Sequence, residues 1–131
     1  MLTARDIMTT EVIGVQASET AWTALNRMLR AGVRALVVHR RNKEDAYGIL
    51  TETDIVYKVV AAGKDPTKVK VQEIMTQPCI VVNPDLGVEY IARLFAQAHI
   101  HHAPVIQEKL LGIVSTSDIL RQAELLMLPV P

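Results

Sequence analysis

The chain has 131 residues, of which 50% are hydrophobic and 21% charged, a composition typical of one compact domain or of two small fused repeats. Fourteen basic residues balance fourteen acidic residues, so no long-range positive field would attract nucleic acid. A single cysteine, Cys79, excludes an intrachain disulfide, and neither a signal peptide nor an apolar run of roughly 18 residues is recognisable. We therefore expect a soluble, cytoplasmic protein that binds neither nucleic acid nor a membrane.

The first half of the chain predicts five elements in the order β-α-β-β-α. After the opening Asp6–Thr9 come a β-branched run, apolar residues at helical spacing, a second apolar run, and a glycine that leads into a strand and a helix. Ser18 is the expected N-cap of the first helix, and Trp22 falls outside the apolar stripe of that helix and should be partly exposed. The first three elements lie over residues 12–15, 21–28 and 35–38, and the last strand and helix together cover residues 48–55.

The second half repeats this order after Gly63 and Pro66, which turn the chain. Its opening, Glu73–Thr76, follows the first opening by 67 residues, and Asp85 takes the position of Ser18. A loop that is shorter by three residues reduces the offset to 64 further along. The repeated elements lie over residues 79–82, 88–95, 103–106 and 112–119.

These patterns predict an α/β (α+β) fold made of two β-α-β-β-α repeats. Repeat 1 covers residues 1–62, a linker covers residues 63–70, and repeat 2 covers residues 71–131. A unit of roughly 60 residues buries too little apolar surface to be comfortably stable alone. We therefore expect the two repeats to pack sheet to sheet around a shared core.

The opening and closing motifs of both halves resemble those of one known family. The pairs Asp-Ile-Met-Thr and Glu-Ile-Met-Thr, with the closings Gly48–Ile55 and Gly112–Ile119, resemble a tandem pair of CBS (cystathionine-beta-synthase) domains. The resemblance runs from Asp6 to about Leu120 and implies a Bateman module with pseudo-twofold symmetry. The sequence is particularly similar to the CBS pairs of cyanobacteria and chloroplasts. Some of those carry a CP12 tail, which this sequence lacks, so we expect no role that depends on one.

The closing motifs contain residue types that suit a nucleotide. Thr51 and Asp54, like Ser115 and Asp118, have the spacing of a capping box, in which a hydroxyl and an acid satisfy a helix start. A helix N-terminus also offers unpaired amides and partial positive charge to a phosphate. The acid can in addition accept the two hydroxyls of a ribose. The structural and the ligand-binding interpretations can hold together.

The resemblance implies two sites, each combining the motif of one repeat with base contacts from the other. His101 and His102 match a basic pair that faces the phosphates in relatives, and Arg34 takes the matching position in the other site. Ile13 and Ile80 would form apolar walls against the base, which any core strand also provides. One site comprises Thr51, Thr53, Asp54, Met75, Ile80, His101 and His102, and the other comprises Ser115, Ser117, Asp118, Met8, Ile13, Arg34 and Ala35.

The sequence contains no Walker loop, no Gly-x-Gly-x-x-Gly and no nucleophile elbow, so we expect no catalytic residues. The histidines His99, His101 and His102 raise the alternative of a metal site. We expect none, because neighbouring strand residues point to opposite faces and no carboxylate lies nearby in the sequence.

These observations lead us to expect a non-enzymatic regulatory module that senses energy state by binding AMP, ADP or ATP, without a required cofactor. By resemblance, two chains would form a flat homodimer, with much of the apolar surface supplied by the helices at 21–28 and 88–95. The module would modulate a partner protein that the sequence does not identify. Two alternatives remain: a ligand-free dimerisation scaffold, and a binder of S-adenosylmethionine.

Overall fold

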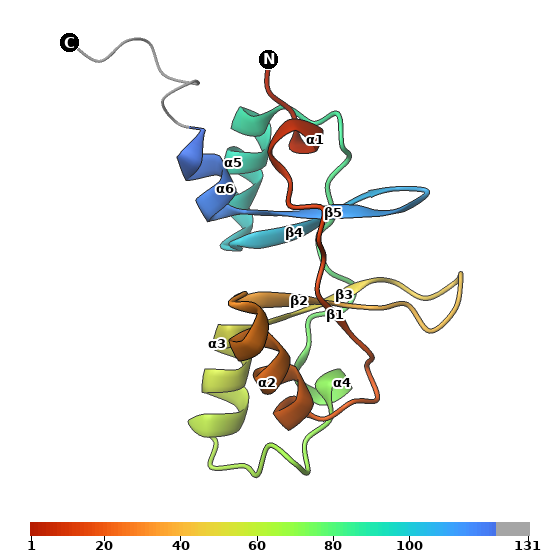
Figure 1. Ribbon diagram of the computed structural model, residues 1–131, viewed down its shortest axis with the longest axis vertical. Helices are drawn as coiled ribbons and strands as arrows, with labels where there is room; N and C mark the ends of the chain where they lie inside the picture. The colour runs from red at the N-terminus through yellow and green to blue at the C-terminus, as the bar shows by residue number, and fades with distance from the viewer. Residues whose placement is uncertain (123–131) are drawn as a thin grey trace, which may run out of the picture. The chain divides into compact units, whose positions relative to one another are not determined.

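The computed structural model describes residues 1–122, which form two compact units (Figure 1). The central unit comprises residues 12–79, and the terminal unit comprises residues 1–11 together with residues 80–122. The opening segment of each sequence repeat therefore packs within the unit that holds the strands of the other repeat. Thr9 bridges Ile113 in the terminal unit, and Thr76 bridges Ile49 in the central unit.

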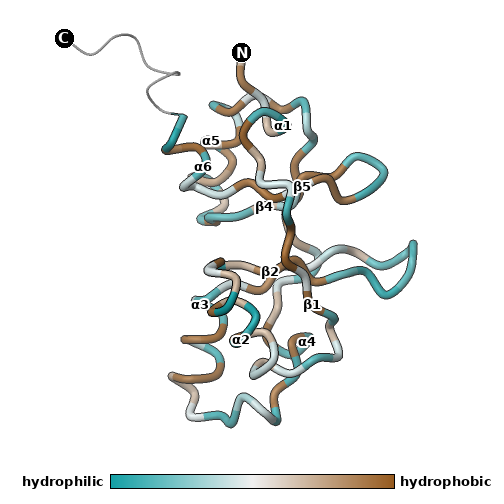
Figure 2. The backbone as a smooth tube through the Cα atoms, viewed as in Figure 1, coloured by the Kyte–Doolittle hydropathy of each residue, from teal (hydrophilic) through white to brown (hydrophobic). Residues whose placement is uncertain are grey.

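The central unit contains a three-stranded sheet in the order β1-β2-β3. Strand β1 (Gly14–Val15) runs parallel to β2 (Ala35–Val38), and β3 (Gly48–Thr51) runs antiparallel to β2. Leu36 and Leu50 are fully buried at the centre of this sheet. The connection between β2 and β3 is hydrophilic (Figure 2), as expected for a solvated turn between two buried strands.

The helices of the central unit pack against this sheet, with α2 and α3 side by side (Figure 1). Ala21, Ala24 and Met28 form the buried stripe of α2, which confirms the predicted helical periodicity. Trp22 is 50% exposed, as the sequence predicts. The helices are α2 (Ala21–Ala31), α3 (Glu52–Ile55), its π-helical continuation η1 (Val56–Val60), and α4 (Val71–Ile74).

The terminal unit contains the antiparallel pair β4 (His102–Gln107) and β5 (Lys109–Ser115). Helices α1 (Ala4–Ile7), α5 (Val88–Ala98) and α6 (Thr116–Arg121) complete it. Its core is formed by apolar residues of α5 and of both strands, among them Ile91, Val105 and Val114. The predicted α/β character and the two repeats are confirmed.

Local details differ from the sequence-based predictions at the repeat starts. The helix caps are Thr20 and Gly87 instead of Ser18 and Asp85, which lie in the preceding turns. The predicted strand over residues 12–15 is reduced to Gly14–Val15. The predicted strand over residues 79–82 is reduced to one parallel bridge between Val82 and Val105. Among residues 1–122, no helix is long and apolar enough to span a bilayer.

Candidate functional site

The closing motif of the central unit forms a complete capping box at the start of α3. The Thr51 N–H donates to Asp54 Oδ2 over 2.9 Å, and the Thr51 hydroxyl lies 3.0 Å from the same oxygen. The Asp54 N–H in turn donates to Thr51 Oγ1 over 3.3 Å. Thr53 Oγ1 lies 2.9 Å from Thr51 Oγ1, so the helix start presents two neighbouring hydroxyls.

The terminal unit repeats this geometry at the start of α6. The Ser115 N–H donates to Asp118 Oδ2 over 2.8 Å, and the Asp118 N–H donates to Ser115 Oγ over 3.1 Å. Asp118 is only 4% exposed, and it is the one charged residue among the buried residues of the described chain. The predicted capping boxes are confirmed at both motifs.

The second oxygen of each motif carboxylate is held by a cation of the same helix. Lys58 Nζ lies 3.1 Å from Asp54 Oδ1, and it also donates to the Ile74 carbonyl over 2.9 Å. Arg121 forms the corresponding ion pair with Asp118 Oδ1. A carboxylate offers about four acceptor sites, so each motif acid retains little free capacity for a ribose while this cation is in place. Neither cation was predicted from the sequence, although Asp54 and Lys58 have the i,i+4 spacing of a helical ion pair.

The structure divides the predicted site residues between the two units. In the central unit, Ala35 pairs with Thr51 across β2 and β3, and the Glu52 N–H donates to the Arg34 carbonyl over 3.0 Å. The central unit holds Ile13, Arg34, Ala35, Thr51, Thr53, Asp54 and Met75, and the terminal unit holds Met8, Ile80, His101, His102, Ser115, Ser117 and Asp118.

In the terminal unit the two histidines border the closing motif. His102 pairs with Ser115 across β4 and β5, and the Thr116 N–H donates to the His101 carbonyl over 2.9 Å. The structure thus brings Arg34 and Ala35 beside the Thr51 motif, and both histidines beside the Ser115 motif. The two cross-repeat sets combine residues of both units and stay a prediction.

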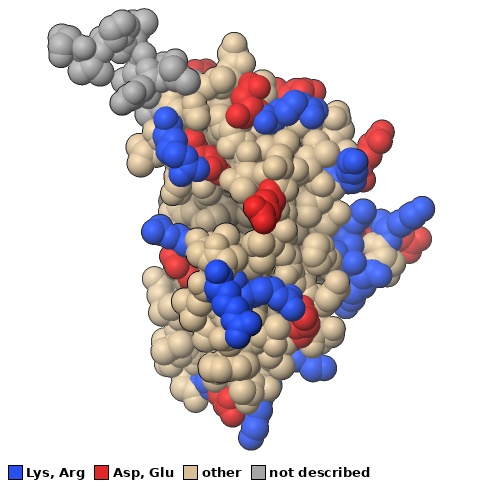
Figure 3. All heavy atoms as spheres, viewed as in Figure 1, with Lys and Arg blue, Asp and Glu red and all other residues tan. Residues whose placement is uncertain are grey.

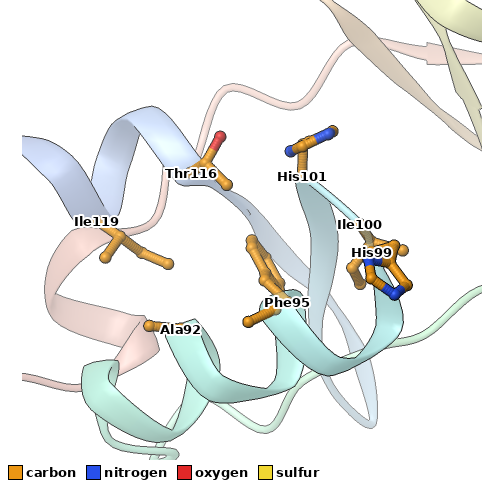
Figure 4. Close-up of a pocket in the computed structure, with 8 residues that line it drawn as sticks. Ala92, Phe95, His99, Ile100, His101, Thr116 and Ile119 are labelled. Atoms are coloured by element: carbon orange, nitrogen blue, oxygen red, sulfur yellow. The ribbon is translucent and has the colours of Figure 1, made fainter.

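A hollow of about 320 Å³ lies in the terminal unit, against α5 and α6. Among the residues that line the hollow in Figure 4, Phe95 is buried, Ile119 is half-buried, and His101 and Thr116 are exposed. Of its lining residues only His101 was predicted as a site residue, because the alanines of α5 are typical of an ordinary core stripe. The lining consists of Ala92, Phe95, Ala96, His99, Ile100, His101, Thr116 and Ile119.

Charged side chains outside the motifs form local ion pairs. Hydrogen bonds from Arg41 hold the pKa of the Asp45 carboxyl well below its usual range, and hydrogen bonds from Arg27 lower the pKa of Glu19. Lys and Arg side chains gather over the β2–β3 connection (Figure 3). Burial raises the pKa of the Cys79 thiol to about 11, so this cysteine is protonated and unreactive at neutral pH.

Metal binding at the histidines gains no support from the structure. Within residues 1–122, no three His, Cys, Asp or Glu side chains are grouped so that they could hold a metal ion.

The family model of the CBS domain matches this chain twice, over residues 4–61 and 71–124. The chain therefore belongs to the CBS domain family and contains a tandem pair of CBS repeats. The hexameric CBS-CP12 protein from bloom-forming cyanobacteria is 52% identical, with a TM-score of 0.94 over 100% of this chain and 76% of that protein. This match confirms the predicted similarity to cyanobacterial CBS pairs.

Two further relatives differ in length and in similarity. The mitochondrial CBS domain-containing protein CBSX3 of Arabidopsis thaliana is 35% identical over 107 residues, which are 79% of this chain. This chain spans only 52% of the length of that plant protein. The CBS domain pair of protein MJ0100, solved in complex with 5'-methylthioadenosine and S-adenosyl-L-methionine, is 23% identical with a TM-score of 0.83, over 97% of this chain and 99% of that chain. At that identity the likeness extends to the fold alone.

Proposed function

We propose that this chain is a non-enzymatic, cytoplasmic sensor that binds AMP, ADP or ATP and modulates a partner protein as a homodimer. The shielding of the two motif carboxylates supports this proposal. Asp6 and Glu73 also accept a backbone N–H at a helix start, but they do so from exposed positions. The Asp54 side chain is only 13% exposed, and Asp118 is buried. Because a cap works equally well at the surface, capping alone does not explain the shielding at both closing motifs, and each acid would accept ribose hydroxyls once the cation of its helix moves away.

The groups around the motifs are those that a nucleotide needs. Thr53 and Ser117 expose hydroxyls at helix starts, where backbone amides and partial positive charge favour a phosphate. Arg34, His101 and His102 border the motifs and would add cationic donors for the phosphates. Met8, Ile13, Met75 and Ile80 would form the apolar contacts with the base, and Ala35 would leave room beside it.

Nucleotide binding would act on the partner through a shift in conformational equilibrium. A ligand that prefers one conformation moves the population toward it by at most the difference between its affinities for the two conformations. The changed surface would then be recognised by the regulated protein. No bond is made or broken in this scheme, so the motif hydroxyls and acids are binding groups and not catalytic residues.

Two other functions fit parts of the same site. S-adenosylmethionine presents the same adenine and ribose, and the MJ0100 domain pair was solved with it. It has no phosphate, however, and would leave the helix starts and the cationic side chains unused. A ligand-free scaffold would keep the caps but would not require shielded acids at both motifs.

Isothermal titration with AMP, ADP, ATP and S-adenosylmethionine tests the proposal. We expect binding of at least one adenine nucleotide, and we expect Asp54→Ala to weaken it by about 1.5–3 kcal/mol, the usual loss for hydrogen bonds to a charged acceptor. Asp54→Asn is the matched control, because its amide oxygen can still cap α3 while the charge is lost. Thermal midpoints measured without ligand show how much fold stability is lost with the cap, about 1 kcal/mol, and so separate this loss from the change in affinity. If none of the four compounds binds, the scaffold is the better description.

A further inference from the structure

The connection between β2 and β3 is longer than its strands require. It runs over residues 39–47, whereas the single residue Glu108 joins β4 to β5 in the terminal unit. Both connections link adjacent antiparallel strands, which a short turn can join. A long loop also costs more closure entropy than a short one. We call residues 39–47 the β2–β3 loop, and hairpin geometry alone does not explain its length.

Several hydrogen bonds hold the β2–β3 loop in place, although its tip is exposed. Nε and Nη2 of Arg41 donate to the two carboxylate oxygens of Asp45 over 2.9 and 3.3 Å. Inside the loop, the side-chain oxygen of Asn42 accepts the Glu44 N–H over 2.9 Å and closes a turn. From outside the loop, the Gln77 side-chain amide donates to Asp45 Oδ1 over 3.1 Å. Compact surface loops of this size frequently carry a function.

The charge that the β2–β3 loop presents to solvent is mainly positive. The Arg41 side chain is 60% exposed, whereas the Asp45 side chain with which it pairs is only 14% exposed. Lys43 is exposed, and the Arg40 guanidinium lies over an aromatic ring of the same loop, 4.7 Å from the ring centre. Within the loop, Glu44 is the one exposed acid. Lys and Arg side chains therefore dominate this part of the surface (Figure 3).

This group of cations suits carboxylates better than it suits nucleic acid or a membrane. Asp45 orients Arg41, and the ring of Tyr47 supports Arg40, so both guanidinium groups lose little side-chain entropy when they bind a carboxylate. Nucleic-acid binding uses more phosphate contacts than three cations supply, and the chain has no net charge. A membrane surface requires large apolar side chains beside the cations, and the exposed tip, residues 41–44, has none.

We infer that the β2–β3 loop is the docking surface for an acidic segment of the regulated protein, a stretch rich in Asp and Glu. Arg40, Arg41 and Lys43 supply the cations that recognise its carboxylates. The loop leads directly into β3, whose last residue, Thr51, begins the closing motif. A change at this motif therefore reaches the loop along one short strand. The inference rests on the partner in the proposed function and adds the surface and the chemistry that recognise it.

Fluorescence anisotropy with a dye-labelled hexaglutamate peptide tests this surface, with a hexaglutamine peptide as the probe that should not bind. We expect the parent chain to bind hexaglutamate, and Arg40→Gln combined with Lys43→Gln to weaken binding by about three- to tenfold, the effect of two exposed ion pairs. Lys64→Gln combined with Lys68→Gln is the matched control, because it removes two exposed positive charges of the same unit outside the loop. This control should weaken binding by less than about twofold, because about 0.1 M salt screens charges beyond roughly 10 Å.

Asp45→Asn distinguishes an ordered docking surface from simple charge attraction. The change removes a negative charge from the loop, so charge attraction alone would strengthen the binding of hexaglutamate. In an ordered surface it releases Arg41, and binding should weaken by about two- to fivefold. Far-UV circular dichroism confirms that each variant is folded. Unchanged or tighter binding by Asp45→Asn would overturn the inference that the ordered loop is the docking surface.

Three further outcomes would contradict the inference. A parent chain that does not bind hexaglutamate, or an equal loss in the loop variant and the lysine control, would overturn the docking surface. Tighter binding of a single-stranded DNA oligonucleotide or of phosphatidylserine vesicles at the same loop would overturn the assignment to an acidic protein segment. Nucleotide titration of the Arg40→Gln, Lys43→Gln variant should match that of the parent, because neither residue belongs to the proposed nucleotide site. Failure of the docking surface is therefore distinguishable from failure of the sensor proposal.

Discussion

The two motif aspartates are held by different cations, and this difference sets how easily each can accept a ribose. Lys58 is 47% exposed at its side chain and divides its ammonium group between Asp54 and the Ile74 carbonyl. Arg121 pairs with Asp118, whose side chain is only 5% exposed. A guanidinium is a planar donor that holds a carboxylate in a fixed geometry, whereas an ammonium is a mobile point charge. Asp54 is therefore the acid from which a ligand displaces the cation more easily.

Lys58→Met should raise the affinity for adenosine by up to about fivefold, because a partly exposed ion pair contributes about 0.2–1 kcal/mol and competes with the ribose hydroxyls for Asp54 Oδ1. Adenosine is the probe because it lacks phosphates that Lys58 could contact. Titration calorimetry of the parent and the variant measures the effect.

Arg121→Met is the matched control for this experiment. It leaves the buried charge of Asp118 without its cation, so it should lower the free energy of unfolding more than Lys58→Met does. Unchanged or weaker adenosine binding by Lys58→Met would show that the ion pair does not compete with the ribose.

Each closing strand contains a glycine next to the residue that bridges an opening segment: Gly48 begins β3, and Gly112 lies in the middle of β5. A Cβ at Gly112 would lie 2.7 Å from the Thr9 carbonyl oxygen and 2.8 Å from the Met8 sulfur. At Gly48 the corresponding contacts are 3.1 Å to the Thr76 carbonyl oxygen and 3.3 Å to the Met75 sulfur. The backbone of the opening segment approaches both glycines, and it does so more closely in the terminal unit.

Gly112→Ala should therefore destabilise the fold by about 1–3 kcal/mol, the usual cost of overpacking, because Thr9 must leave its bridge to Ile113. Gly48→Ala should cost less, because its nearest neighbours have to move only a few tenths of an ångström. Urea unfolding followed by far-UV circular dichroism compares the two. An equal cost at both positions would contradict the difference in close contacts.

Apolar periodicity predicted the main helices and strands in their order, but it did not predict the short helices α1 and α4 of the opening segments. The helix caps could not be predicted from the sequence. Ser18 and Thr20 both carry a suitable oxygen, and only the structure shows that Thr20 accepts the hydrogen bond from the Thr23 N–H. The cap of α5 is Gly87, which has no side chain to read. The run 79–82 has the composition of a strand, but only Val82 finds a ladder partner, in β4.

Site residues defined by local spacing were predictable, and those defined by packing were not. The capping boxes follow from a hydroxyl and an acid three residues apart, and the structure contains both. The hollow depends on which face of α5 meets α6, so Ala92 and Ala96 looked like ordinary core positions in the sequence. Whether the two cross-repeat sets form binding sites stays a prediction for the titrations to test.

In the whole molecule, each opening segment packs in the unit that holds the strands of the other repeat and then continues directly into the second unit. The chain passes between units near residues 11–12 and again near residues 79–80. Thr9 bridges β5 shortly before the first passage, and Thr76 bridges β3 shortly before the second. A ligand that shifts either closing motif would therefore also shift a segment of the chain that continues directly into the other unit. In the proposed sensor, the continuous chain would transmit a conformational change from the nucleotide site to both units.

The pH dependence of nucleotide affinity tests whether the protein recognises the phosphate groups of its ligand. A polyphosphate near His101 and His102 favours their protonated forms, so binding takes up protons and the affinity for ATP should rise as pH falls from about 8 to 6. The affinity for adenosine should change little over this range, and added salt should weaken the binding of ATP more than that of adenosine. Titrations of both ligands across the pH range provide the measurement.

Replacing both histidines with Gln keeps hydrogen-bonding capacity but removes the titratable charge, so the rise in ATP affinity toward low pH should disappear while adenosine still binds. His101→Gln alone should remove most of the effect, because His101 is exposed whereas His102 is half-buried in β4. A pH dependence that survives the double replacement would assign the phosphate contact elsewhere.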